Sequence, residues 1–265
     1  MKFLKSIVLT AVALLSMSMS AMAEDDSRQL AKKLANPIAD LISVPLQNNY
    51  DCCFGPNRAS RFTLNIQPVI PFALNDDWNL IVRTIAPLVY QGSPAPGFGD
   101  RFGLSDIEQS FFFSPRNETG GVTWGVGPVF LWPTATDREL GTGKWGAGPT
   151  GVVLKQSGGW TYGLLANHVW SYAGDGNREN VSQSFMQPFV SYTFRDTTSL
   201  SLSSETSYDW RDRQWVVPIN AGVSKMFRFG RQPVSLGISG RYYAEAPKDG
   251  PKWGLRLVAT FLFPK

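Results

Sequence analysis

The sequence predicts an all-β protein, a transmembrane antiparallel β-barrel of about 12 strands that follows a short N-terminal amphipathic helix. Three observations predict it: apolar residues alternate with polar ones over runs of 11 to 13 residues, the runs are even in number, and aromatic residues recur at their ends. Charged residues make up 17% of the chain, against about 25% in soluble domains. This composition excludes a disordered chain, and two cysteines are too few for a disulfide scaffold.

Residues 1–23 have the three parts of an export signal. Lys2 and Lys5 give a positive start, residues 7–15 form a short apolar run, and Ala21-Met22-Ala23 ends the segment as a cleavage site. The run is too short to cross a membrane as a helix. We therefore expect a cleaved signal peptide and a mature chain that starts at Glu24 and is exported to the cell outer membrane of a Gram-negative bacterium.

Residues 24–41 predict a helical segment before the barrel. Its apolar side chains are three or four positions apart, the spacing of one face of a helix: Leu30, Leu34, Ile38 and Leu41. Asn36-Pro37 would end or bend the helix. The segment could plug the periplasmic mouth of the barrel, lie across it, or be a frayed extension.

Residues 42–265 form the predicted barrel domain. In residues 78–90, for example, Leu80 and Val82 belong to the apolar set, while Arg83 lies in the middle of the other set. A charge at that place means that the second set does not face a dry core. Apolar side chains facing lipid and polar ones facing a wet lumen satisfy this pattern. Twelve runs are predicted as strands: 42–54, 60–72, 78–90, 102–114, 122–132, 145–156, 160–172, 182–194, 199–210, 214–227, 233–243 and 253–263.

The connections and strand ends agree with such a barrel. Short connections at 73–77, 157–159, 195–198 and 228–232 alternate with longer ones at 91–101, 133–144, 173–181 and 244–252. Aromatic residues at strand ends form either a girdle at the membrane surface, which we favour, or caps on a sandwich core: Trp78, Tyr90, Trp132, Trp160, Trp170, Tyr172, Trp210, Trp215 and Trp253. Prolines inside the runs predict local bulges: Pro68, Pro87, Pro128, Pro149, Pro188 and Pro218.

Few residues offer catalytic or metal chemistry. Cys52-Cys53 are either a disulfide or redox pair, or two incidental cysteines, and without nearby histidine they make no zinc site. His168, the single histidine, falls in the lipid-facing set, where a structural or interfacial role is favoured over a barrel hydrolase. The chain has no G-x-S-x-G motif and no glycine-rich loop between a strand and a helix. We expect no enzyme activity, no catalytic residue, no metal and no cofactor.

Charged residues that face the lumen are the best functional candidates. Alternation directs seven of them inward: Arg83, Asp106, Glu108, Glu205, Asp209, Arg241 and Arg256. Such charges need partners or water, so they predict either a network that closes the barrel or the lining of a small polar pore. Inward Phe185, Phe189 and Leu262 would narrow a lumen that lies between a filled eight-stranded barrel and an open porin.

The sequence also resembles a known group of proteins through a series of segments: LANPIADLISVPLQNN (34–49), LNIQPVIP (64–71), residues 78–84, WGVGPVF (124–130), PTATD (133–137), WGAGPTGVV (145–153), QWVVPIN (214–220) and PVSL (233–236). These are similar to bacterial outer-membrane proteins labelled "transporter" or "neuromedin U", which are related to the barrel family named after the phenol meta-degradation pathway. The resemblance implies an outer-membrane barrel and, more weakly, transport.

The function expected from these features is a narrow, porin-like passive channel or transporter for small solutes, aromatic or hydrophobic ones among them. The alternatives are a closed structural or surface-interaction barrel without transport and, less favoured, a barrel hydrolase. The expected partners are outer-membrane lipid, the outer-membrane assembly machinery and an unidentified small-molecule solute. No basic cluster indicates binding to nucleic acid.

Overall fold

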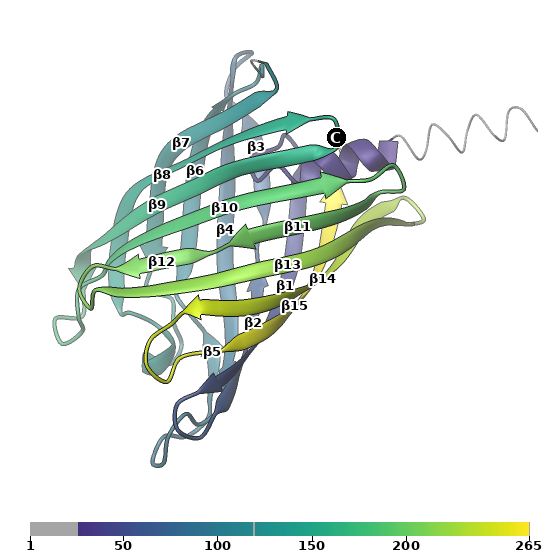
Figure 1. The fold of residues 1–265 in the computed structure, drawn as a ribbon. Coiled ribbons are helices and arrows are strands. Elements are labelled where there is room, and N and C mark those ends of the chain that lie inside the picture. Colours follow the sequence, from purple (N-terminus) through teal and green to yellow (C-terminus); the bar gives the residue numbers. More distant parts are fainter. Residues whose placement is uncertain (1–25, 119, 265) are drawn as a thin grey trace, which may run out of the picture.

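The computed structural model describes residues 26–118 and 120–264, so the predicted signal peptide (1–23) lies outside the described residues. The described chain is one β-barrel with a short helix, residues 26–34, at one end (Figure 1). The strands are β1 Ile42–Phe54, β2 Ala59–Ile66, β3 Val69–Ala73, β4 Trp78–Gln91, β5 Arg101–Leu104, β6 Ile107–Pro115, β7 Val122–Trp132, β8 Lys144–Ser157, β9 Trp160–Gly174, β10 Ser182–Thr193, β11 Thr198–Ser204, β12 Thr206–Asp209, β13 Gln214–Phe229, β14 Gln232–Glu245 and β15 Trp253–Phe263.

Antiparallel pairing runs around the whole wall and closes it. β1 pairs with both β2 and β15, and β10 pairs with β9, which leaves no free edge. Three wall positions hold two short strands in line, because β2 and β3, β5 and β6, and β11 and β12 share neighbours. The wall therefore has twelve positions, and the prediction of an antiparallel barrel of about 12 strands with a short N-terminal helix is confirmed.

The runs 60–72, 102–114 and 199–210 are not continuous strands, contrary to the prediction. Pro68 lies in the gap between β2 and β3, where it has no N–H to donate to the ladder. Pro188 in β10 faces the gap between β11 and β12, so that pairing stops at Met186↔Thr206 and resumes at Phe189↔Ser203. The register also shifts between Val217 and Pro218. Proline thus accounts for local interruptions of a wall that otherwise stays closed.

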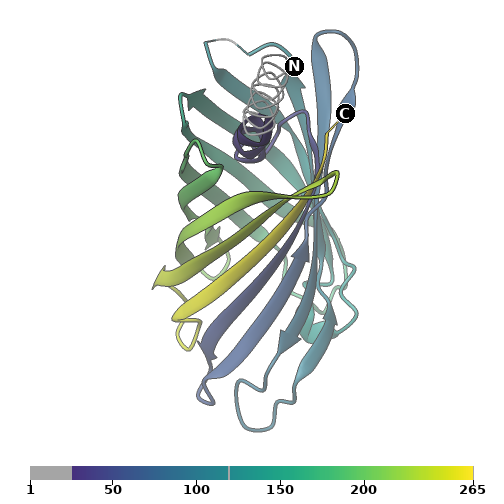
Figure 2. The same cartoon turned by 90° about the vertical axis from the view of Figure 1, so that its right-hand side faces the viewer.

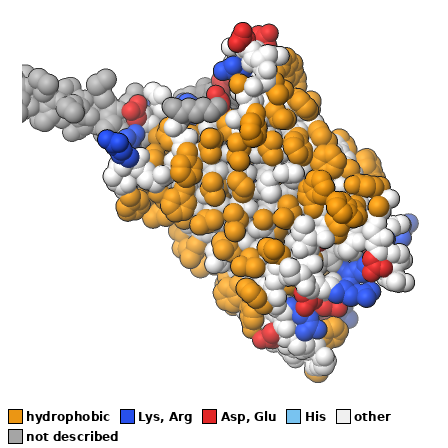
Figure 3. Space-filling view, turned by 180° about the vertical axis from the view of Figure 1, so that it is seen from behind, with side chains coloured by type: hydrophobic (Ala, Val, Ile, Leu, Met, Phe, Trp, Pro, Cys, Tyr) orange, Lys and Arg blue, Asp and Glu red, His pale blue; other side chains and the backbone are white. Residues whose placement is uncertain are grey.

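The outer face carries an apolar band. In β15, Leu255 and Leu257 are exposed, whereas Arg256 between them is buried. This inverts the arrangement of a soluble protein and fits a wall whose outside touches lipid. Figure 3 shows hydrophobic side chains over the middle of one face, with charged side chains gathered toward its two ends.

The two ends of the barrel differ. The connections 92–100, 133–143, 175–181 and 246–252 lie at one end, called here the loop end, and one of them contains the 3-10 helix η1 Arg138–Leu140. The N-terminal helix lies at the opposite end, the helix end, as Figure 2 shows. Across residues 26–118 and 120–264, no helix is both long and apolar enough to cross a lipid bilayer.

Candidate functional site in the barrel lumen

The N-terminal segment, residues 26–41, enters the lumen from the helix end. Leu30, Ala31 and Leu41 pack against Met226 and Leu262 of the wall. These residues share one side of the segment because apolar side chains three or four positions apart lie on one face of a helix. The helix ends before Asn36-Pro37, as the sequence predicts. This packing supports the plug among the three placements considered for the segment.

A deeper contact holds the end of the segment. Ile38 is buried among Ile81, Phe112, Leu154 and other side chains of the wall, and Phe185 and Phe189 pack against the same cluster. Across the segment, Gln156 Nε2 donates to the Lys32 carbonyl at 2.8 Å. The segment is thereby held against two sides of the lumen, which it narrows together with the inward aromatic rings.

Beyond the segment, an ion-pair network crosses the lumen. Arg256 on β15 donates from Nη1 and Nη2 to the two carboxylate oxygens of Glu205, at 2.7 and 2.6 Å. Its Nε donates to Asn49 Oδ1 at 2.7 Å. Arg241 on β14 donates to Asp51 at 3.1 Å and lies 3.7 Å from Glu205. Asn49 and Arg256 lie opposite each other on the neighbouring strands β1 and β15. Glu205, however, lies between β11 and β12, which β13 and β14 separate from β15, so the network links different parts of the wall.

Two further predicted charges lie in the same region. Arg83 donates to Gln67 Oε1 at 3.3 Å and interacts electrostatically with both Glu108 and Glu205. Glu108 accepts from Asn167 Nδ2 at 3.2 Å. The lumen therefore brings together five of the seven predicted charges, three arginines and two glutamates, and Asp51 adds a third acid.

Asp106 and Asp209 lie outside this network. Asp106 lies in the break between β5 and β6, and its carboxylate accepts from the amide and hydroxyl of Thr142 at 2.6 and 2.7 Å. Asp209 accepts from the amides of Arg211 and Asp212 in the turn after β12. Both residues stabilise connections at the loop end.

Sequence reasoning missed Asp51 and Asn49, although their alternation with Tyr50 in β1 was a usable signal.

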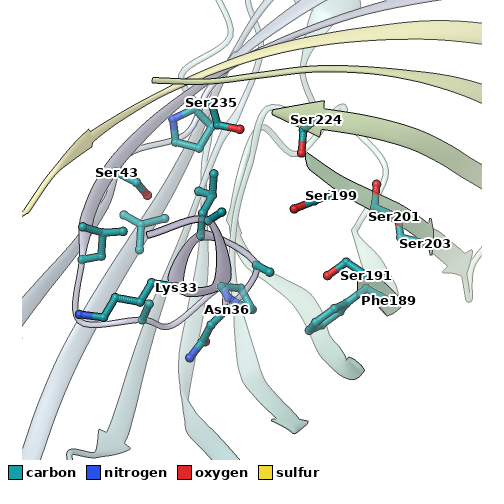
Figure 4. A pocket seen from close by; sticks show the side chains of 18 of the residues that line it. Lys33, Asn36, Ser43, Phe189, Ser191, Ser199, Ser201, Ser203, Ser224 and Ser235 are labelled. Carbon is teal, nitrogen blue, oxygen red and sulfur yellow. The ribbon is translucent and has the colours of Figure 1, made fainter. Parts of the chain in front are cut away.

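A cavity of about 320 Å³ separates the N-terminal segment from the wall. Leu34 and Asn36 line one side, and hydroxyl groups line the other (Figure 4). The hydroxyl groups come from Ser191, Ser199, Ser201, Ser203, Ser224 and Ser235. The sequence TSLSLSS in β11 produces part of this stripe, because alternate residues of a strand face the same side. A second cavity of about 230 Å³ shares Leu34 and several of these serines and extends to Arg256.

The outer face of the wall has an apolar hollow of about 660 Å³ nearby. Val153, Tyr162 and Leu164 line it, and all three are exposed. Four residues border both this hollow and the larger cavity inside: Phe189, Val190, Leu202 and Ser203. They flank the place where Pro188 interrupts the β10 ladder. At this place a single sheet with an interrupted ladder separates the lumen cavity from the outer hollow.

Cysteine and histidine lie away from the lumen network. Cys52 and Cys53 form a disulfide with each other near the loop end of β1. His168 lies on the outer face, as predicted, with its ring 4.1 Å from that of Trp170 between centroids. In the part of the chain that the structure describes, no cluster of three histidine, cysteine or acidic residues could hold a metal ion.

Comparisons with known proteins identify the fold. No protein-family model matches this sequence, and no curated protein does. Among solved structures, an outer membrane channel from Pseudomonas putida F1 is similar, with a TM-score of 0.67, 15% identity, and coverage of 84% of this chain and 96% of that one. Outer membrane phospholipase A from Escherichia coli is similar with a TM-score of 0.50, 12% identity, and coverage of 85% and 90%.

These similarities define the class of protein: the chain has the fold of the outer-membrane β-barrels. The two similar proteins are themselves outer membrane proteins. At such identities the similarity concerns the fold alone. The particular function must be argued from the lumen and the wall of this chain.

Proposed function

We propose that the protein is a narrow passive channel for small, largely apolar solutes of the outer membrane. The observation that carries this proposal is the route formed by the lumen cavity and the apolar hollow, which share Phe189 and Leu202. A solute in the lumen would therefore be separated from the membrane there by a single sheet, whose ladder is interrupted opposite Pro188. The channel neighbour has the same fold and is compatible with this role.

The chemistry of the route supports the class of solute. Serine hydroxyls line one side of the cavity, while Leu34, Val69 and Phe189 provide apolar contacts. A small molecule with an aromatic or aliphatic body and one or two polar groups matches both surfaces. The ion pairs among Glu205, Arg241 and Arg256 occupy much of the remaining polar lumen. A wide stream of hydrated ions would have to disrupt them, so we expect a low conductance.

Planar-bilayer recordings on the purified full-length protein test the proposal, together with swelling of liposomes in small solutes. The test variant is Ser201→Trp, which places a large ring in the cavity. Its matched control is Leu200→Trp, because Leu200 is the preceding residue of β11 and is exposed on the outer face. We expect Ser201→Trp to reduce conductance and solute flux severalfold, with little change for Leu200→Trp.

Two results would count against the channel. Absence of both conductance and flux from the unmodified, folded protein would instead indicate the closed structural barrel. Equal effects of the two tryptophan variants would exclude the cavity as the route. Folding of each variant is checked by its β-sheet circular dichroism, so that a misfolded barrel is not counted as a blocked one.

A further inference from the structure

A polar cluster interrupts the lipid-facing side of the barrel near the loop end. His168 of β9 lies directly opposite Ser184 of β10 in the antiparallel register. The neighbouring outward positions are apolar or aromatic, with Leu164, Trp170 and Met186 all exposed. Neither the lumen network nor the proposed transport route uses this cluster, so the inference drawn from it is independent of the transport proposal.

The hydrogen bonds indicate which atoms of the cluster donate and which accept. Trp210 Nε1, which can only donate, donates to Ser184 Oγ at 2.9 Å. Ser184 Oγ lies 2.8 Å from His168 Nδ1, and the other ring nitrogen lies 3.5 Å from Ser182 Oγ. When Nε2 carries the ring proton and is directed at Ser182, Nδ1 is free to accept the proton of the Ser184 hydroxyl. This is the arrangement in which an imidazole activates a serine nucleophile.

The surrounding rings hold this geometry. The His168 ring lies 4.1 Å from the Trp170 ring between centroids and 6.4 Å from that of Trp210. Tyr208 supports Trp210 in turn, at 5.0 Å with an edge-on arrangement. Aromatic packing therefore limits how far the imidazole and the indole can rotate. Three strands, β9, β10 and β12 with the turn after it, supply the cluster.

The position of the cluster determines what could reach it. Ser182 is the first residue of β10 and Ser184 the third, and Trp210 directly follows β12. All of them lie near the loop end, the end that outer-membrane barrels direct outward. The cluster thus faces the outer leaflet close to the water boundary. Acyl chains can lie beside it, and water can reach it from the connection 175–181.

We propose that Ser184 and His168 form a catalytic pair that hydrolyses carboxylic esters whose acyl chain lies in the membrane beside β9 and β10. Ser184 Oγ attacks the ester carbonyl carbon, and the hydroxyl proton passes to His168 Nδ1. The bond from carbon to the alcohol oxygen then breaks, and the departing alcohol takes that proton. A water molecule attacks the acyl group on Ser184, again with His168 as base, releasing the carboxylic acid and restoring the serine.

Trp210 and Ser182 have supporting roles in this reaction. The indole N–H of Trp210 is a positioning group, because it donates to Ser184 Oγ and so directs the hydroxyl proton of Ser184 toward His168 Nδ1. Ser182 is a positioning residue, since its hydroxyl faces the second ring nitrogen of His168. The absence of a G-x-S-x-G motif does not bear on this site, because the pair comes from two strands of a barrel wall.

The test uses the full-length protein folded into phosphatidylcholine vesicles. A fluorophosphonate probe, which reacts with activated serines, should label Ser184 alone, as located by peptide mass spectrometry. The vesicles should also release free fatty acid, or p-nitrophenol from an added p-nitrophenyl palmitate. Ser184→Ala should abolish both labelling and release, and His168→Ala should reduce both by about 10²–10⁴-fold.

Two further variants separate catalysis from structure. Trp210→Phe keeps an aromatic ring but loses the N–H that orients the Ser184 hydroxyl, so it should lower kcat severalfold with little change in KM. Ser207→Ala is the control, because Ser207 pairs with Phe185, whose ring packs in the lumen. It should retain full labelling and hydrolysis. Labelling that persists in Ser184→Ala, or hydrolysis no faster than in protein-free vesicles, would overturn the proposal.

Discussion

Substitution of Glu205 tests how much the ion pairs of the lumen network contribute to the stability of the barrel. Its carboxylate accepts two hydrogen bonds from Arg256 and also lies 3.7 Å from Arg241. The substitution Glu205→Gln preserves the size of the side chain but removes its charge. Arg241 would retain Asp51 as its ion-pair partner, whereas Arg256 would keep only neutral acceptors within hydrogen-bond distance, namely Asn49 and the amide oxygen of the new side chain.

The expected cost follows from the burial of the pair. The side chains of Arg256 and Glu205 are 9% and 21% exposed. Removing one partner of a buried ion pair typically costs about 3–5 kcal/mol, because the other charge stays buried without compensation. Because Glu205 is partly exposed, we expect the lower end of this energy range, so Glu205→Gln should reduce the free energy of unfolding by about 3 kcal/mol.

An exposed ion pair in the same barrel serves as the control. Lys225 and Asp196 form a 3.1 Å pair at the helix end with side chains 46% and 58% exposed. Asp196→Asn should therefore lower the free energy of unfolding much less than Glu205→Gln does. Unfolding in urea is followed by tryptophan fluorescence of the protein in lipid vesicles. If Glu205→Gln is no more destabilising than Asp196→Asn, the network does not stabilise the barrel, and the argument from burial fails.

Three other predictions concern the wall, the plug and a loop. Gly148→Ala should lower the free energy of unfolding by about 1–3 kcal/mol, because the added Cβ would collide with the backbone of β9. A Cβ added at Gly240 meets no atom within 4 Å, so Gly240→Ala should leave urea unfolding nearly unchanged. Ile38→Ala should weaken docking of the N-terminal segment by about 2–5 kcal/mol, seen as faster amide exchange confined to residues 30–41. A hydrogen bond from Tyr90 and another from the Ser93 amide lower the pKa of Asp100. The connection 92–100 should therefore stay protected from amide exchange at pH 5 and lose this protection only below the usual aspartate pKa of about 3.9; unchanged protection at pH 2 would refute this.

The wall was predictable from the sequence because a barrel imposes one simple rule along its whole length. Each strand must alternate between lipid and lumen, and each must be long enough to span. For this reason the predicted run 214–227 agrees with β13, Gln214–Phe229, to within two residues. The interruptions were less accessible. Proline indicated where the ladder is weakened, but not that β11 and β12 would separate opposite Pro188.

The candidate site was only partly predictable, since alternation gives the face of a residue and not its partner. It directed both Arg256 and Glu205 inward, but it did not indicate that these residues, 51 positions apart in the sequence, are in contact. Alternation also loses its meaning at a strand break, which is why Asp106 contacts a loop instead of the network. In the same way, the contact of Ser184 with His168 depends on the pairing of β9 with β10, which no local pattern specifies.

The structure also favours one way of opening the lumen over another. Expelling the N-terminal segment would expose Leu30, Ile38 and Leu41, all of them buried. At about 1.5–3 kcal/mol for each side chain, that costs roughly 5–9 kcal/mol, so an expelled segment would be populated below about one part in 10³. A solute that passes beside the segment through the serine-lined cavity bears no such cost. The proposed route would instead need only a local movement around Phe189 and Leu202, beside the interrupted ladder.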